Sequence, residues 1–420
     1  MNLNRVVITG VGALTPVGNN APDFWDGLTE GVSGAAPIQN FDAAKFKTKF
    51  ACEVKNFDPT KYIDPKESRK LDPFTRYGIV AAEEAISDSG ILNDNINKER
   101  TGVIWASGIG GMQTIVSEVG EFTRGDGTPR FNPFFIPKMI PDISAGHISI
   151  KYGFQGPNYA TVSACASSAN AIADAYNLIR LDMADIIICG GSEAAINEAG
   201  VGGFNAMHAL STRNDDPATA SRPFDKDRDG FVLGEGAGGL ILENLEHAIA
   251  RGAKIYAEIT GVGLTADAHH ITAPCPDGTV VARAMKVAVE MGGNKITEVA
   301  HINTHGTSTP VGDIAEIKGI VSLFGEHTPN IAINSTKSCT GHLLGAAGAI
   351  ETIATAFAVK NNLVPPTINH FTDDENITSL QNLNIVFNKK QEKVVDLALC
   401  NTFGFGGHNV SIAIKKYNAR

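Results

Sequence analysis

A cysteine surrounded by small side chains is the first feature of the sequence that suggests chemistry. Cys165 lies in residues 161–170 (TVSACASSAN), among Ala, Ser and one Val. If a helix begins close behind it, the unpaired N–H groups of the first turn stabilise a thiolate and could hold the oxyanion of a thioester under attack. A buried free cysteine without chemistry is the alternative that this stretch alone leaves open.

A histidine follows an apolar segment in the second half of the chain. His305, in residues 303–313 (NTHGTSTPVGD), precedes a glycine, so its ring is expected at a strand end, where α/β folds place their sites. Thr307 and Thr309 add two hydroxyls beside it. A structural hydrogen-bonding histidine is the alternative interpretation.

A lysine and a second histidine open the small-sided stretch 335–348 (STKSCTGHLLGAAG). Lys337 is expected to be partly buried there and therefore to need a carboxylate, for which Asp313 and Glu316 are the candidates. Metal binding by His305 and His342 is conceivable. However, no third ligand has suitable spacing, and a metal would leave the cysteine without a role.

Two phenylalanines alternate with glycines in residues 401–409 (NTFGFGGHN), which is not the pattern of an ordinary strand. Glycines permit positive φ and close approach, while the rings of Phe403 and Phe405 supply movable apolar bulk. A hinged lid over an apolar tunnel and a plain hairpin turn both fit this stretch.

Alternating strands and helices must position these groups. We expect a helix over 73–89 and another over 169–178, and strands over the remaining apolar runs: 5–10, 102–106, 185–189, 300–304, 331–334, 397–402 and 409–415. The run 185–189 (DIIIC) is typical of a strand covered on both faces. The alternation favours mostly parallel sheets sandwiched by helices.

The length of 420 residues predicts two domains or one body built from two similar halves. A weak internal echo favours the second: residues 162–165 and 337–340 each join a strand, through a polar bend, to a helix rich in Ala and Gly. Helices with such small side chains can pack very closely, which predicts buried helices at the centre of the molecule.

Composition excludes several classes of function. A net charge of −10 argues against nucleic-acid binding. No apolar run approaches the roughly 20 residues that span a bilayer, so no membrane association is expected, and the N-terminal apolar run is too short for a signal peptide. Six scattered cysteines form neither a disulfide framework nor a zinc motif, which is typical of a reducing cytoplasm.

Taken together, the four motifs VSACASS, NTHGTSTPVGD, STKSCTGHLLGAAG and NTFGFGG closely resemble those of the β-ketoacyl-acyl-carrier-protein synthases. The resemblance extends from ITGVGALTPVG at the N-terminus through residues 210–232 (LSTRNDDPATASRPFDKDRDGFV) to the last strand. It implies a thiolase-like α/β fold, with two similar βαβαβαββ halves in an αβαβα layered sandwich. The halves would be 1–254, with the cysteine, and 255–420, with both histidines, the lysine and the lid.

The resemblance also implies roles for the residues singled out above. Cys165 would carry the acyl chain as a thioester, with the N–H groups of Cys165 and Phe405 as oxyanion hole. His305 and His342 would hold the enolate that forms when malonyl carrier protein loses carbon dioxide. Lys337, tied to Asp313 or Glu316, would organise the pocket, and Phe405, with Phe403 beside it, would act as a gate. No cofactor is implied, because the carrier protein brings the phosphopantetheine arm.

Further residues follow from the resemblance as binding contacts. Thr307, Thr309 and Thr272 would touch the arm, and the acyl tunnel wall would contain Ile109, Met112 and Phe204. The acyl- and malonyl-loaded carrier proteins are acidic and would need a local basic patch, for which the candidates are Lys66, Arg69, Lys70, Arg124, Arg130 and Lys138. A cytoplasmic homodimer is the family expectation. The chain departs from the usual synthase II pattern at His208, where Arg is expected in the patch, and at Thr304, where Ala is commoner.

Two other functions stay open at this point. A ketosynthase of a specialised polyketide or aryl-polyene pathway would share all four motifs. A non-catalytic partner subunit of the chain-length-factor type would lack the nucleophile, so Cys165 argues against it. Thiolases use a second cysteine as base, and the two histidines and Lys337 disfavour that chemistry.

Overall fold

One mixed sheet forms the frame of the molecule in the computed structural model, which describes residues 3–418. Its strand order is β12-β10-β9-β14-β15-β8-β1-β7-β6-β4-β5. The first half of the chain supplies β1 (Val6–Leu14), β4 (Thr101–Ala106), β5 (Asn158–Tyr159), β6 (Ile186–Glu193) and β7 (Gly236–Asn244). The second half supplies β8 (Ala257–Ala266), β9 (His301–Asn303), β10 (Ala332–Asn334), β12 (Asn384–Ile385), β14 (Leu397–Gly404) and β15 (His408–Lys415).

The two halves repeat one pattern of strand pairing. In the first, β1 pairs antiparallel with β7, β7 antiparallel with β6, and β6 parallel with β4. In the second, β8, β15, β14 and β9 pair in the same order and senses. The halves join where β1 and β8 pair antiparallel over three residues. This duplicated order confirms the thiolase-like architecture that the motifs predict.

A short sequence repeat accompanies this duplication, although the motif analysis missed it. Residues 8–12 in β1 and 259–263 in β8 both read ITGVG. A Cβ on any of the four glycines would come within 3.0 Å of a backbone carbonyl of the covering helix, so each helix lies directly on its strand. The covering helices are α3 (Pro73–Ser89) on β1 and α10 (Thr279–Met291) on β8.

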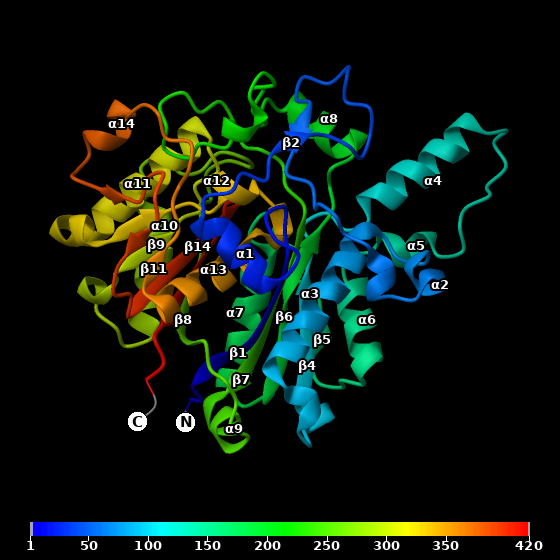
Figure 1. Cartoon of the computed structure of the whole chain (residues 1–420). Helices are drawn as coiled ribbons and strands as arrows, with labels where there is room; N and C mark the ends of the chain where they lie inside the picture. Colours follow the sequence, from blue (N-terminus) through cyan, green and yellow to red (C-terminus); the bar gives the residue numbers. More distant parts are fainter. Residues whose placement is uncertain (1–2, 419–420) are drawn as a thin grey trace.

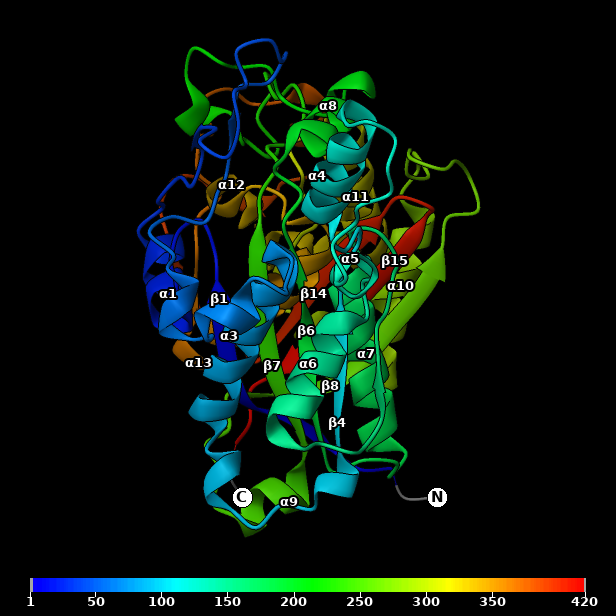
Figure 2. The ribbon, with the colours of Figure 1, turned by 90° about the vertical axis from the view of Figure 1, so that its right-hand side faces the viewer.

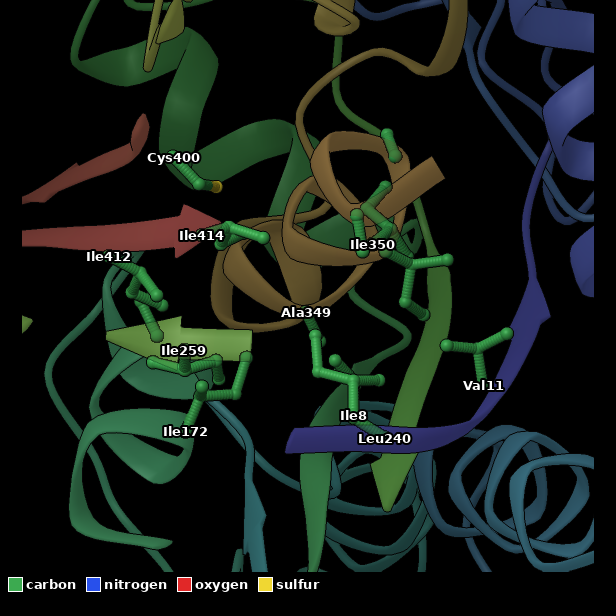
Figure 3. Close-up of a cluster of buried hydrophobic side chains, with 14 of the residues drawn as sticks. Ile8, Val11, Ile172, Leu240, Ile259, Ala349, Ile350, Cys400, Ile412 and Ile414 are labelled. Carbon is green, nitrogen blue, oxygen red and sulfur yellow. The ribbon is translucent and has the colours of Figure 1, made fainter. Parts of the chain in front are cut away.

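Two helices form the buried central layer, as the small-residue stretches predict. They are α7 (Ser167–Arg180) and α13 (Ala347–Asn361), which pack against each other and against strands of both halves. Residues 347–359 of α13 are all buried. A Cβ at Gly348 would lie 2.7 Å from the backbone nitrogen of Ala169, so only glycine permits this approach. Figure 3 shows Ala349 and Ile350 of α13 among apolar side chains of both halves.

The remaining helices lie outside this central layer (Figures 1 and 2). They are α1 (Ala21–Thr29), α2 (Pro65–Ser68), α4 (Met112–Arg124), α5 (Phe135–Met139), α6 (Ile143–Tyr152), α8 (Glu198–Ala206), α9 (Leu245–Ala250), α11 (Pro310–Phe324), α12 (Lys337–Thr340) and α14 (Glu375–Thr378). The short strands β2 (Ala36–Pro37) and β3 (Phe50–Ala51), and β11 (Leu363–Val364) and β13 (Gln391–Glu392), form two small pairs. Across residues 3–418 no helix combines the length and apolarity needed to cross a membrane.

An arm made of α4 and α5 projects from the body (Figure 1). It exposes large apolar side chains, namely Val119, Phe122, Phe131, Phe134 and Ile136. An apolar surface of this kind is typical of a contact with another protein.

Most expected elements are found with small changes in extent. The helix over 73–89 matches α3 at both ends, and the strand expected over 5–10 continues to Leu14. The statement that the alternating Phe and Gly residues exclude a strand is wrong in part, because Phe403 and Gly404 belong to β14. The division at 254/255 lies between α9 and β8, and we propose it as the boundary of the halves.

Candidate active site

Cys165 lies in a sharp bend two residues before α7. The preceding residue, Ala164, has φ of +52°, which is unusual for a residue with a side chain and costs about 1–2 kcal/mol. Hydrogen bonds hold the bend: the Ser163 N–H donates to Ser167 Oγ at 2.9 Å, and that hydroxyl donates to the Ala164 carbonyl at 2.6 Å. The small residues around the cysteine therefore form an elbow, and the thiol is 7% exposed.

The turn between β14 and β15 covers the thiol. Gly404 pairs with His408, so the turn contains Phe405, Gly406 and Gly407, and both of these glycines have positive φ. A Cβ at Gly404 would lie 2.7 Å from the Ser163 carbonyl, so only glycine lets the turn approach the elbow. The backbone N–H groups of Phe405 and Cys165 both face the sulfur. The segment therefore forms a hairpin, and its Phe405 N–H joins the N–H of Cys165 where an oxyanion would form.

Two imidazoles face the same thiol from the second half of the chain. His305 follows β9, and its ring centroid lies 5.2 Å from that of His342, with the planes nearly perpendicular. One ligand atom from each of Cys165, His305 and His342 lies within 4.8 Å of the others. The thiol is thus a third possible ligand atom beside the two imidazoles, one that sequence spacing alone does not indicate.

Both histidines are neutral in this setting. Burial lowers their pKa values well below 6.5, and the nearby Lys337 ammonium lowers them further. A neutral imidazole still carries one N–H donor, so each ring can donate a hydrogen bond to a developing oxyanion.

The expected partner of Lys337 is wrong. The buried ammonium pairs with Glu351 on α13 rather than with Asp313 or Glu316. The chain turns back after α12, and this turn brings the first part of α13 beside the lysine. The sequence carries a signal for this pair, because Glu351 is the only charged residue between His342 and Lys360.

Asp313 and Glu316 support the histidine loop instead. Glu316 accepts the backbone N–H groups of His305 and Gly306 at 3.0 and 2.9 Å, and the amide of Asn401 at 3.1 Å. Asp313 pairs with Arg228 at 3.2 Å. Burial raises the pKa of Glu316 to about 7 and that of Asp313 to about 6.

The thiolate expected at Cys165 is not the resting form. Burial raises the pKa of the thiol to about 11, and it outweighs the lowering by the Phe405 N–H and by Lys337. The start of a helix favours a thiolate, but it does not reveal the enclosure of the sulfur, which raises the pKa.

Alkylation of Cys165 by iodoacetamide is therefore expected to accelerate about tenfold per pH unit from pH 7 to 9, because the thiolate fraction rises at that rate below the pKa. Mass spectrometry of the Cys165 peptide measures the rate, with Cys165→Ala as the blank. A plateau near pH 7 would contradict the raised pKa.

A cavity of about 370 Å³ connects the thiol to the surface. Its lining contains Thr272, Thr307, Thr309, Phe204, Phe403 and Phe405 together with Cys165 and both histidines. The hydroxyls of Thr307 and Thr309 lie 3.0 Å apart. Ile109 and Met112 do not line this cavity, but they pack in the adjoining apolar cluster that contains Cys165, Phe204 and Leu344.

The six basic candidates lie in two places: Lys66, Arg69 and Lys70 on or just after α2, and Arg124, Arg130 and Lys138 on the arm. The arm's helix α4 packs against α8. The segment after α8 leads to Met207 and His208, which line the cavity. Two of the six already have acidic neighbours: Lys70 pairs with Glu67 at 2.7 Å, and Arg130 lies 3.5 Å from Asp126.

Comparison with known proteins gives full-length matches. The family model "Beta-ketoacyl synthase, N-terminal domain" matches residues 3–248, and "Beta-ketoacyl synthase, C-terminal domain" matches 256–371. The chain is 48% identical to 3-oxoacyl-[acyl-carrier-protein] synthase 2 of Synechocystis sp. (98% of both chains) and 48% identical to that of Staphylococcus aureus (99% of both). A beta-ketoacyl synthase structure from Burkholderia phymatum superposes with a TM-score of 0.91 at 33% identity, over 99% of this chain and 100% of the other.

Two further ketosynthases have similar structures. The ishigamide ketosynthase/chain length factor has a TM-score of 0.91 at 32% identity, and a type II polyketide ketosynthase in complex with its acyl-carrier protein has 0.90 at 31%. Each comparison covers 99% of this chain and 100% of the other.

Proposed function

Because the chain belongs to the beta-ketoacyl synthase family, we propose that it condenses malonyl-acyl carrier protein with an acyl chain held on Cys165, as a 3-oxoacyl-[acyl-carrier-protein] synthase. Membership in this family makes it an acyltransferase that forms carbon–carbon bonds. The convergence of Cys165, His305 and His342 within 4.8 Å is the observation that carries the assignment of the site.

Acyl transfer is the first half-reaction. The Cys165 sulfur attacks the thioester carbonyl, and the carrier's phosphopantetheine thiol leaves with the proton that Cys165 gives up. The negative charge on the carbonyl oxygen is stabilised by the N–H groups of Cys165 and Phe405, which already face the sulfur. Because the resting pKa is about 11, the thiol is mostly protonated at neutral pH and gives up its proton as it attacks the thioester.

Decarboxylation and condensation follow. The malonyl carboxylate leaves as carbon dioxide, and the electron pair of the broken bond forms an enolate. Neutral His305 and His342 donate N–H groups to the enolate oxygen, which compensates for its charge in a buried site. The enolate carbon then attacks the acyl-Cys165 carbonyl, and the Cys165 sulfur leaves as a thiolate, which takes up a proton to restore the resting thiol. The product is a 3-oxoacyl chain two carbons longer on the carrier protein.

Phe405 is proposed as the gate between the two half-reactions, since it is half-buried above the thiol on a turn of two positive-φ glycines. Phe405→Ala is expected to slow acylation of Cys165 at least about tenfold, or about 1.4 kcal/mol, and to leave the unfolding midpoint nearly unchanged. Single-turnover acylation measures this effect. The exposed Phe371→Ala is the control, and unchanged acylation would remove the gate.

The proposed partner is an acyl carrier protein that docks on the basic residues of α2 and the arm. The arm also exposes apolar side chains, and the edge strand β5 lies beside exposed Val162. We propose that a second copy of the chain covers this edge as a homodimer.

The reaction needs no cofactor beyond the phosphopantetheine of the carrier protein. All six cysteines are free, and we propose a cytoplasmic location.

A specialised polyketide ketosynthase is the second candidate, because the solved polyketide ketosynthases share the fold over the whole chain. The greater identity to the 3-oxoacyl-[acyl-carrier-protein] synthases favours chain elongation. The test incubates the protein with malonyl carrier protein and with acyl carriers of several lengths, and identifies the products by mass. Single additions of two carbons support elongation, repeated unreduced additions support the polyketide function, and no condensation product refutes both.

A further inference from the structure

Glu193, at the end of β6, is a completely buried carboxylate that has no role in the chemistry above. It accepts four hydrogen bonds, two on each oxygen. Oε1 accepts from the hydroxyl of Ser107 at 2.9 Å and the N–H of Ile109 at 3.2 Å. Oε2 accepts from the N–H groups of Gly108 at 2.8 Å and Gly345 at 3.0 Å. Burial raises its pKa, and these four donors oppose that shift because they favour the ionised form.

The four donors belong to segments that meet beside the nucleophile. Gly108 is so close to the elbow that a Cβ there would lie 3.3 Å from the Ala164 carbonyl and 2.8 Å from Glu193. Gly345 follows Leu344, which has φ of +48° and lines the cavity with Cys165. One carboxylate thus ties the loop after β4, from the first half, to the turn before α13, from the second.

We propose that Glu193 is a positioning residue that fixes the wall of the acyl pocket. The apolar cluster next to Cys165 contains Ile109 and Leu344, each on a segment that Glu193 holds. A loop released from the carboxylate would have to be ordered by the acyl chain itself. Such ordering costs free energy only when the chain is long enough to reach the loop. Loss of Glu193 is therefore expected to slow the reaction of Cys165 with long acyl groups and to leave its reaction with short ones unchanged.

The chemistry of the site explains why a carboxylate is required. A glutamine of the same shape has one amide NH₂. If this NH₂ lay at the Oε2 position, it would face the N–H groups of Gly108 and Gly345, donor against donor. At the Oε1 position it can donate to the Ser107 hydroxyl, but it opposes the N–H of Ile109. In its better orientation, the glutamine of Glu193→Gln therefore leaves the buried N–H of Ile109 without a partner, which weakens the hold on this loop.

The test uses N-alkyl iodoacetamides of increasing chain length, which label Cys165 without a carrier protein. For Glu193→Gln we expect the ratio of alkylation by long reagents to alkylation by iodoacetamide to fall about tenfold relative to the same ratio in the parent protein. The ratio cancels any change in the pKa of Cys165, which the Glu193 charge helps to raise. Glu235→Gln is the matched control, since Glu235 is also buried but accepts hydrogen bonds from Val54 and Tyr77, outside the two segments that Glu193 holds. An unchanged length profile, or an equal change in Glu235→Gln, overturns the proposal.

A second variant and a second substrate complete the test. Ser107→Ala removes one of the four donors and is expected to shift the length profile in the same direction by a smaller factor, which keeps the proposal testable if Glu193→Gln does not fold. The second substrate is acyl carrier protein loaded with long or short chains, and this experiment rests on the proposed function. In Glu193→Gln, kcat/KM for long chains should fall, while kcat/KM for short chains should stay the same. If no condensation occurs with the parent protein, the proposed function fails and the alkylation profile still decides the role of Glu193.

Discussion

Cys165→Ala is expected to abolish acyl transfer and condensation while some decarboxylation of malonyl carrier protein continues. The loss follows because the sulfur is the atom that bears the acyl chain, and no other cysteine reaches the cavity. Loss of a nucleophile commonly costs on the order of 10⁶ in rate. Decarboxylation survives because His305 and His342 come from separate segments, and their N–H groups remain in place.

Mass spectrometry of the chain after incubation with acyl carrier protein measures the acyl-enzyme, and carbon dioxide release measures decarboxylation. Cys189→Ala is the matched control, since Cys189 is buried in β6 and lies outside the cavity. His342→Ala should show the opposite pattern, with acylation retained and decarboxylation lost. Elongation at the full rate by Cys165→Ala would refute the mechanism.

Glu351→Ala is expected to be strongly destabilising. It leaves the Lys337 ammonium buried without its partner, and breaking a buried ion pair on one side costs about 3–5 kcal/mol. The urea midpoint of unfolding should fall accordingly. Lys337→Met should also destabilise the fold, because it leaves the carboxyl group of Glu351 buried and unpaired.

The double variant Lys337→Met, Glu351→Leu separates stability from activity. Replacing both charges with apolar groups of similar volume is often neutral for stability. The urea midpoint of unfolding of the double variant should therefore return most of the way to that of the parent protein. Condensation should stay impaired, because the ammonium that adds to the effect of burial in lowering the pKa values of both imidazoles is gone. If the free energy of unfolding of either single variant lay within about 1 kcal/mol of that of the parent protein, the role of the pair would be contradicted.

The sequence indicated the reacting groups better than their partners. The motifs that contain Cys165, His305 and His342 are local, and the resemblance supplied the topology that brings them together. The partner of Lys337 was missed because it depends on how α13 folds back beside α12. The protonation of Cys165 was missed because it depends on enclosure by distant segments. Glu193 gave no local signal, since its four donors come from residues about 85 and 152 positions away.

The internal symmetry of the sheet has a consequence for how this site can be assembled. Cys165 precedes α7 and His342 precedes α13, and these are equivalent helices in the two halves. A symmetric pair of two identical half-length chains would carry the same residue at the start of both helices. A thiol at one and an imidazole at the other thus require two different sequences in one assembly. Joining the halves at β1 and β8 in a single polypeptide guarantees one of each, at fixed stoichiometry, in every molecule.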